Sequence, residues 1–212
     1  MFKNYKTLIF DCDGVILDSN SLKTSAFHKT VIEDGAINAS KLVKFHKMNG
    51  GISRYSKFEY YLNSINSESS FSMDELLQKY KNLVINGLLE CNTSKGFDLF
   101  IKQNINEHCL VVSGGDQSEL NQVFNVRNLS HFFNGGIFGS PCNKEEIISR
   151  EIKNGNIVFP AVFFGDSKYD FEVSNKFGID FIFLSELSDV NDAKDWCIKN
   201  KINNYSNFNE VK

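Results

Sequence analysis

Short apolar runs that each end in polar or acidic residues recur along this chain of 212 residues. They lie at residues 7–10, 109–112, 161–164 and 181–184, and the first three are followed by Asp-Cys-Asp-Gly, Ser-Gly-Gly-Asp and Gly-Asp-Ser. Residues 132–138 are turn-rich and have room for one more short strand. Helix-period patterns occur at about residues 116–125, 143–154, 168–177 and 190–200. Strands that alternate with helices predict an α/β fold, a doubly wound, Rossmann-like parallel sheet with helices on both faces.

A long helical block separates the first apolar run from the second. Residues 19–91 contain several stretches with helical periodicity and no convincing strand. Ser72, with Glu75 three residues later, is a capping-box pattern that predicts a helix start. We therefore expect a small all-helical unit over residues 18–93, inserted into a discontinuous core made of residues 1–17 and 94–212.

Charge and cysteine usage exclude several classes of protein. The formal net charge is −3, whereas a protein that binds nucleic acid by neutralising phosphates is normally basic. The five cysteines form no CxxC pair, so a disulfide framework or a zinc site is not expected. No apolar stretch approaches about 18 residues, and the N-terminus does not resemble a signal peptide. We expect a cytoplasmic monomer that binds neither nucleic acid nor membrane.

Acidic residues at the predicted strand ends indicate a metal site. Asp11 and Asp13 follow the first run, and Asp166 follows the third. Ligands of doubly wound sheets bind at the carboxyl ends of the strands, so these side chains should converge. Clustered carboxylates repel one another, and Mg²⁺ with oxygen ligands would neutralise them. Carboxylates, Mg²⁺ and a hydroxyl group beside a glycine-rich turn suit phosphoryl transfer.

Four ordered motifs resemble those of the haloacid dehalogenase superfamily. Residues 8–19 are similar to its first motif, especially in the subgroup of phosphoglycolate phosphatase and β-phosphoglucomutase. Residues 111–115 resemble the second motif, Lys144 within residues 139–144 the third, and residues 163–170 the fourth. The resemblance covers about residues 8–184, and four motifs in order are far more specific than one DxD alone.

The resemblance implies roles for three aspartates. Asp11 would be the nucleophile that forms an aspartyl-phosphate. Asp13 would be the general acid and base, with its backbone carbonyl also binding Mg²⁺. Asp166 would bind Mg²⁺ directly, so the implied metal ligands are Asp11, Asp13 and Asp166.

The remaining motif residues have plainer alternative roles. Ser113 and Gly114 would bind the phosphoryl group, although the same residues suit an ordinary strand-to-helix turn. Lys144 would offset the charge of Asp11 and of the phosphate, although a lysine in a first helical turn is usually solvated. Asp170 would act through water or through Lys144, although an acid near a helix N-terminus is favoured by the helix dipole alone.

The resemblance also implies that the helical insertion is a mobile cap over the site. Arg54 ends a Gly-Ile-Ser-Arg run similar to one that places an arginine over the substrate in the mutase-like subgroup. Its guanidinium suits a phosphate or a carboxylate, and the alternative is an arginine that satisfies a helix end. Lys57 could join Arg54 or be a surface charge, and His46 is more typical of a core-facing histidine. The mutase pattern has a histidine where this chain has Lys23.

These features predict a Mg²⁺-dependent phosphatase that acts on a small-molecule phosphate ester, a sugar phosphate or a phosphoglycolate-like compound. The first alternative is a phosphosugar mutase of the β-phosphoglucomutase type, against which Lys23 counts mildly. The second is a non-catalytic protein that binds a phosphorylated ligand, because a fold alone does not fix function. A dehalogenase is disfavoured because Asp13 would have no use there.

Overall fold

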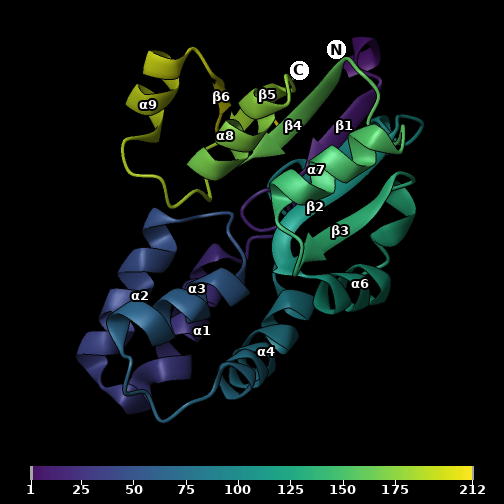
Figure 1. Cartoon of the computed structure of the whole chain (residues 1–212). Coiled ribbons are helices and arrows are strands. Elements are labelled where there is room, and N and C mark those ends of the chain that lie inside the picture. Colours follow the sequence, from purple (N-terminus) through teal and green to yellow (C-terminus); the bar gives the residue numbers. More distant parts are fainter. Residues whose placement is uncertain (1, 212) are drawn as a thin grey trace.

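A six-stranded parallel sheet forms the centre of the computed structural model, which describes residues 2–211 (Figure 1). All neighbouring strands pair in parallel, in the order β3-β2-β1-β4-β5-β6. The strands are β1 (Thr7–Phe10), β2 (Cys109–Asp116), β3 (Gly136–Ser140), β4 (Ala161–Gly165), β5 (Asp180–Leu184) and β6 (Asn203–Tyr205). The order reverses at β1, so the predicted doubly wound α/β fold is confirmed.

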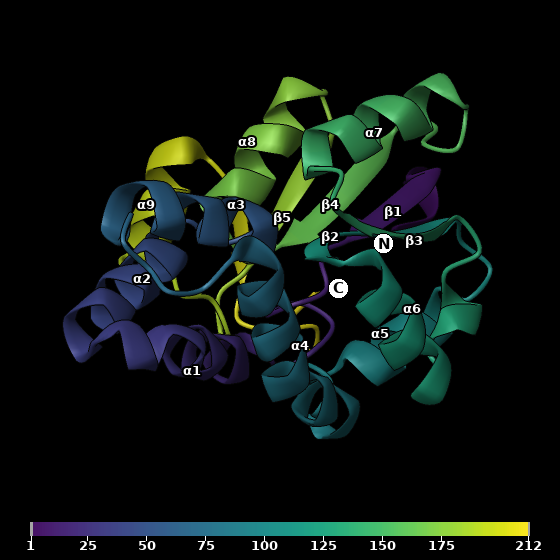
Figure 2. The same cartoon turned by 60° about the horizontal axis from the view of Figure 1, so that its bottom comes forward.

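Helices cover both faces of the sheet (Figure 2). They do so because its buried strands carry apolar side chains on both sides. Phe10 and Phe164 face α5 (Phe97–Gln103) and α6 (Gln117–Val126) in one hydrophobic cluster. Ile9 and Phe163 belong to a second cluster with α7 (Lys144–Lys153) and α8 (Lys168–Lys176). A further helix, α9 (Ala193–Asn200), precedes the edge strand β6. The alternation along β1 and β4 thus fixes which helices lie on which face.

The block between β1 and β2 is helical, as the sequence predicts (Figure 1). We call this block the helical insertion; it comprises α1 (Asn20–Val31), α2 (Ala36–Met48), α3 (Arg54–Tyr60) and α4 (Met73–Glu90). Its core is aromatic, with the rings of Phe27, Phe58 and Tyr80 in mutual contact. The capping box is confirmed, since Ser72 and Glu75 exchange side-chain to backbone hydrogen bonds at the start of α4.

Two adjacent linkers join the helical insertion to the sheet. The backbone N–H of Asp18 donates to the carbonyl of Asn92 (2.9 Å), and Leu17 and Thr93 form an antiparallel bridge. The chain therefore leaves and re-enters the core at one place. This arrangement positions the insertion over the carboxyl ends of the strands.

Three local features differ from the sequence expectations. The second strand runs on to Asp116, through residues expected to form a turn, with a register irregularity between Val112 and Asp116. The short helix α5 and the strand β6 were not expected. Strand β6 is polar and pairs with β5 through its backbone, so it carries no hydrophobic alternation to reveal it. Within residues 2–211, no helix has the length and apolar character needed to span a membrane.

Candidate active site

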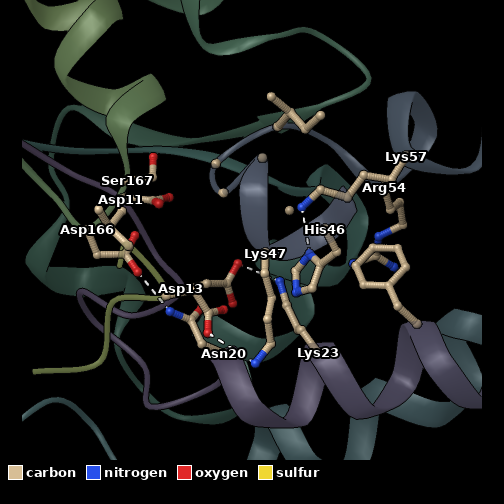
Figure 3. Close-up of a pocket in the computed structure, with 18 of the residues that line it drawn as sticks. Asp11, Asp13, Asn20, Lys23, His46, Lys47, Arg54, Lys57, Asp166 and Ser167 are labelled. Atoms are coloured by element: carbon tan, nitrogen blue, oxygen red, sulfur yellow. Dashed lines mark hydrogen bonds and ion pairs between the residues drawn. The ribbon is translucent and has the colours of Figure 1, made fainter. Parts of the chain in front are cut away.

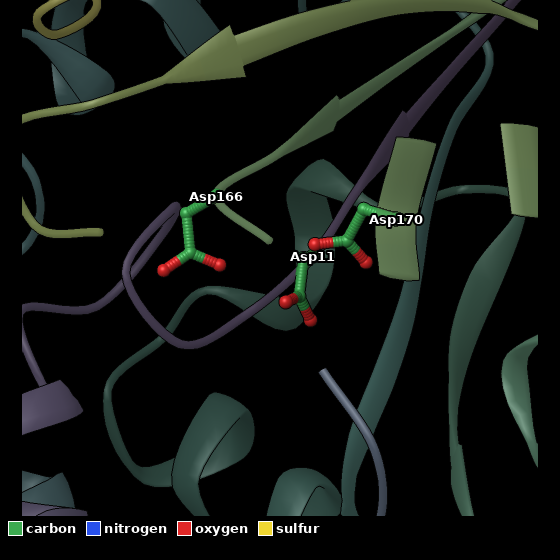
Figure 4. Close-up of side chains that lie close together, drawn as sticks. All are labelled: Asp11, Asp166 and Asp170. Atoms are coloured by element: carbon green, nitrogen blue, oxygen red, sulfur yellow. The ribbon is translucent and has the colours of Figure 1, made fainter. Parts of the chain in front are cut away.

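Three buried carboxylates meet at the carboxyl end of the sheet (Figure 4). Asp11 follows β1 and Asp166 follows its neighbour β4, while Asp170 lies in the first turn of α8. One carboxylate oxygen from each lies within 4.8 Å of the others. The predicted convergence of Asp11 and Asp166 is therefore seen, and Asp170 joins them.

Gly14 allows Asp166 to approach the loop that follows β1. Its φ is +74°, and a Cβ built on it would lie 2.1 Å from Asp166 Oδ2. No side chain could occupy that position without displacing the carboxylate, and L-residues rarely adopt this φ. Glycine at position 14 is therefore required by both the loop conformation and the acidic cluster.

Lys144 is the cation of the acidic cluster. Its Nζ lies 2.9 Å from Asp11 Oδ2 and 2.5 Å from Asp170 Oδ1, and the lysine is 1% exposed. Burial alone would lower the pKa of Lys144, but Asp11 and Asp170 raise it above its usual range. The solvated-lysine alternative for Lys144 is therefore wrong.

Three buried carboxylates share one positive charge, so the charged forms of Asp11 and Asp166 are disfavoured. Burial raises the pKa of Asp11 to about 7, although Lys144 opposes the shift. Burial together with the charges of Asp11 and Asp170 raises the pKa of Asp166 well above its usual range. Both oxygens of the Asp170 carboxylate accept hydrogen bonds, from Lys144 and Ser167, whereas the Asp166 carboxylate accepts only from Asn20 Nδ2 among the described residues (2.7 Å). A divalent cation with oxygen ligands would fit beside Asp11 and Asp166.

Asp13 turns its side chain away from the other carboxylates and toward the helical insertion (Figure 3). Its Oδ1 accepts from Ser19 Oγ (2.6 Å), and its Oδ2 lies 2.5 Å from Lys23 Nζ on α1. Burial would raise the pKa of Asp13, but Lys23 and Ser19 lower it below its usual range. Asp13 was one of the predicted metal ligands, but its side chain brings no oxygen to the acidic cluster. This is consistent with metal binding through its backbone carbonyl.

The glycine-rich end of β2 closes against the helical insertion. A Cβ on Gly114 would lie 2.5 Å from the carbonyl oxygen of Gly51, so the two backbones touch. Gly114 and Gly115 line the cavity, while Ser113 is fully buried and its Oγ accepts from the N–H of Gly115 (3.0 Å). The predicted phosphate-binding turn therefore offers backbone to the cavity, and the Ser113 hydroxyl stabilises the turn.

The cavity between sheet and insertion is small in this closed arrangement. It measures about 60 Å³, room for a few water molecules. Its walls come from the end of β2, from the loops after β1, β4 and β5, and from the helical insertion, including α1, α2, α3 and α4. This volume is too small to hold a phosphate ester of more than a few atoms.

Arg54 lines this cavity but is already paired. Its two terminal nitrogens bond both carboxylate oxygens of Glu119 on α6, and its guanidinium lies 4.6 Å from the ring centroid of Tyr80. Next to it, Tyr55 donates to Asp116 (2.7 Å). The bonds of Arg54 and Tyr55 join α3 to the start of α6. The structure thus places Arg54 in the predicted cavity wall and gives its charge a partner that the sequence did not suggest.

Several site residues were missed from sequence. Asn20 bonds Asp166, Lys23 bonds Asp13, and Glu119 bonds Arg54. The sequence allowed Lys57 either to join Arg54 or to be a surface charge. The surface-charge interpretation is wrong because Lys57 is 4% exposed. The spacing of Arg54 and Lys57 on one helix, three residues apart, was the available signal that both face the same way.

Comparison with known proteins places the chain in context. A family model described as haloacid dehalogenase-like hydrolase matches residues 8–184. A comparison with curated protein sequences finds no match.

Solved structures of similar fold cover nearly the whole chain. A predicted phosphatase from Clostridium acetobutylicum aligns with a TM-score of 0.76 at 19% identity, covering 98% of this chain and 96% of its own. A β-phosphoglucomutase from Clostridium difficile aligns with a TM-score of 0.75 at 20% identity, covering 98% and 93%. CbbY from Rhodobacter sphaeroides, in complex with phosphate, aligns with a TM-score of 0.74 at 13% identity, covering 98% and 96%. At these identities, the structures establish a shared fold.

Proposed function

Because the chain belongs to the haloacid dehalogenase-like hydrolase family, we propose that it is a Mg²⁺-dependent phosphatase of small phosphorylated metabolites. The observation that carries the proposal is the buried cluster of Asp11, Asp166 and Asp170 with a single lysine, Lys144. Such a cluster gathers carboxylate oxygens at a strand end, beside a glycine-rich turn. The substrate class is a sugar phosphate or a phosphoglycolate-like compound.

Asp11 is the proposed nucleophile. One of its oxygens attacks phosphorus, the bond from phosphorus to the leaving oxygen breaks, and an aspartyl-phosphate forms. Asp13 must be protonated to serve the leaving oxygen, although Lys23 lowers its pKa in this arrangement; it gives that proton to the leaving oxygen and then takes a proton from the water that cleaves the aspartyl-phosphate. Lys144 holds Asp11 in place and offsets its charge, and Asp170 in turn holds Lys144.

The donor set of the site fits Mg²⁺. Asp11 and Asp166 each offer a carboxylate oxygen, and we propose the Asp13 backbone carbonyl as a further ligand. When bound, the ion would neutralise the carboxylates and the phosphate, so that an anionic nucleophile and an anionic substrate can approach. Gly114 would then present its backbone N–H group to the phosphate, while the N–H of Gly115 stays bonded to Ser113 Oγ.

We propose that residues 18–93 act as a cap on a core formed by residues 1–17 and 94–212. The closed cavity of about 60 Å³ supports this, because a substrate needs an open state to enter and a closed state to exclude bulk water. The paired linkers at Leu17 and Thr93 would be the hinge.

A panel of small phosphate esters, assayed with Mg²⁺ and with a chelator, tests this function. We expect inorganic phosphate release that needs the metal. Absence of turnover on every ester would favour the non-catalytic alternative, a protein that only binds a phosphorylated ligand.

A phosphosugar mutase is the second candidate, supported by the similarity of fold to a β-phosphoglucomutase. The products separate the two activities. A mutase conserves phosphate and yields an isomeric sugar phosphate, whereas a phosphatase releases inorganic phosphate.

A further inference from the structure

The wall of the cavity formed by the helical insertion carries four basic side chains (Figure 3). Three of them have a carboxylate partner. Lys23 pairs with Asp13, Arg54 with Glu119, and Lys47 with Asp189. The fourth, Lys57 on α3, forms no ion pair with any of residues 2–211. A lysine without a carboxylate is unusual at 4% exposure, since burial of an unpaired charge is strongly unfavourable.

Neutral groups hold the Lys57 ammonium in place. Its Nζ donates to His46 Nδ1 (2.8 Å), and His46 Nε2 lies 3.1 Å from Thr24 Oγ1. Burial, together with Lys57 and Lys23, lowers the pKa of His46 to about 2, so the imidazole is neutral and brings no charge to the pair. The Phe27 ring lies 5.3 Å from the ammonium. These contacts orient the ammonium without neutralising it.

The position of Lys57 in the cavity matters as much as its charge. Figure 3 shows Asp11 and Asp166 at one side of the cavity and Lys57 with His46 at the other, with Asp13 and Lys23 between them. A substrate whose phosphoryl group meets Asp11 would extend past Asp13 toward Lys57. The far end of that substrate would therefore meet an oriented cation without a carboxylate partner in a buried environment, where a charge-assisted hydrogen bond is strong.

We infer that Lys57, oriented by His46, binds a second acidic group of the substrate, a carboxylate or a second phosphate, at the end opposite the phosphoryl group that is cleaved. This inference rests on the proposed phosphatase function and narrows it to phosphate esters with two acidic groups. The sequence suggested Arg54 as the residue that binds a phosphate or a carboxylate of the substrate. In this structure, however, both terminal nitrogens of Arg54 already bond the carboxylate of Glu119. Burial and the charge of Lys23 lower the pKa of Lys57 to about 7, as expected for a cation that lacks its anion.

Matched pairs of phosphate esters test the inference. The first pair is 2-phosphoglycolate and 2-hydroxyethyl phosphate, which differ by a carboxylate. The second is glucose 1,6-bisphosphate and glucose 6-phosphate, which differ by a phosphate. We expect the wild-type protein to favour the doubly acidic member of at least one pair by about tenfold or more in kcat/KM. The pair that shows the preference identifies the acidic group.

Substitution of Lys57 should abolish this preference. In Lys57→Met, the ratio of kcat/KM within the preferred pair should fall to within about threefold of one. The ratio cancels any general effect of the substitution on folding or closure. Lys47→Met is the matched control, because Lys47 lines the same cavity but is half exposed and faces Asp189, and its ratio should match the wild-type ratio. Lys57→Gln replaces the charge with an amide if the methionine variant does not fold.

Three results would separate the possible failures. A wild-type ratio near one in both pairs, or an unchanged ratio in Lys57→Met, would overturn the role of Lys57 while leaving the phosphatase intact. Absence of phosphate release from all four esters would overturn the proposed function instead. In that case, calorimetric binding of 2-phosphoglycolate and glucose 1,6-bisphosphate to the wild-type and Lys57→Met proteins still tests the inference, and equal affinities for both ligands would refute it.

Discussion

Lys23 Nζ lies 2.5 Å from Asp13 Oδ2, and this ion pair connects the helical insertion to the loop that follows the central strand β1. Ser19 donates to the other oxygen of the same carboxylate (2.6 Å). The proposed general acid and base is therefore held by a residue of the insertion, so its position depends on closure.

Lys23→Met should lower kcat by about 10- to 100-fold, because a misplaced acid and base costs catalysis on that scale. KM should change less than kcat, since Lys23 is already paired with Asp13. Steady-state kinetics with saturating Mg²⁺ measures both. Lys79→Met, which removes the exposed ion pair of Lys79 and Glu33 in the insertion, is the control. A wild-type kcat in Lys23→Met would show that Asp13 needs no support from the insertion.

Glu119→Ala should destabilise the protein by about 3–5 kcal/mol, because it leaves the buried guanidinium of Arg54 without its carboxylate. Adding Arg54→Met should restore much of that loss, since the uncompensated charge is then gone. Urea denaturation of the two single variants and the double variant measures the coupling. Additive losses in the double variant would mean that the Arg54–Glu119 pair does not join the insertion to the core.

Lys57→Met should stabilise the protein by about 1–4 kcal/mol below pH 7, where the wild type buries a charged lysine. The folded-state pKa is about 7 and the unfolded value is the usual one near 10.5, so between them the unfolded wild type binds more protons. Wild-type stability therefore rises with pH in that window, and the advantage of Lys57→Met shrinks toward pH 10.

Urea denaturation at pH 6 and pH 9 checks this dependence. The residues that influence the pKa of Lys57 or bond its ammonium must stay unchanged in both proteins. They are Lys23, Asp13, Asp11, Lys144 and His46. A difference between wild type and variant that is equal at both pH values would contradict the lowered pKa of Lys57.

Mg²⁺ at roughly ten times its Kd should raise Tm by about 3–6 °C, because the ion binds the folded carboxylates and not the unfolded chain. Asp166→Asn should remove this response. The variant should also be about as stable as the wild type without the ion, since burial and the neighbouring carboxylates already disfavour the charged form of Asp166. Asp195→Asn, at an exposed position on α9, should keep the full response. An unchanged Mg²⁺ response in Asp166→Asn would exclude Asp166 as a ligand.

The sheet was readable from the sequence because its strands are short apolar runs that end in glycine and acids. Strand β1 matches the expected residues 7–10, and the alternation of Ile9 and Phe10 between two clusters follows from the strand period. The edge strand β6 was not readable, since it is held by backbone pairing and carries no apolar pattern.

The hydrogen-bond and ion-pair partners of the site residues depend on tertiary packing, so they could not be predicted from the sequence as the strands could. Asp11 and Asp166 were predicted to converge because parallel strand ends share an edge. Glu119 and Arg54 are 65 positions apart and meet only because α3 lies against the start of α6. Whether Lys57 is buried or exposed depends likewise on α1 and α2 covering it, which helical periodicity alone does not reveal.

Phosphate release by the wild type and by Asp11→Asn, measured on the same ester panel with Mg²⁺, tests the central claim most directly. Asp195→Asn serves as the surface control, and circular dichroism checks that each variant is folded. We expect the wild type and the control to release phosphate at similar rates, and Asp11→Asn to fall by more than about 10³-fold. A folded Asp11→Asn protein that keeps a rate within about tenfold of the wild type would contradict the role of Asp11 as nucleophile.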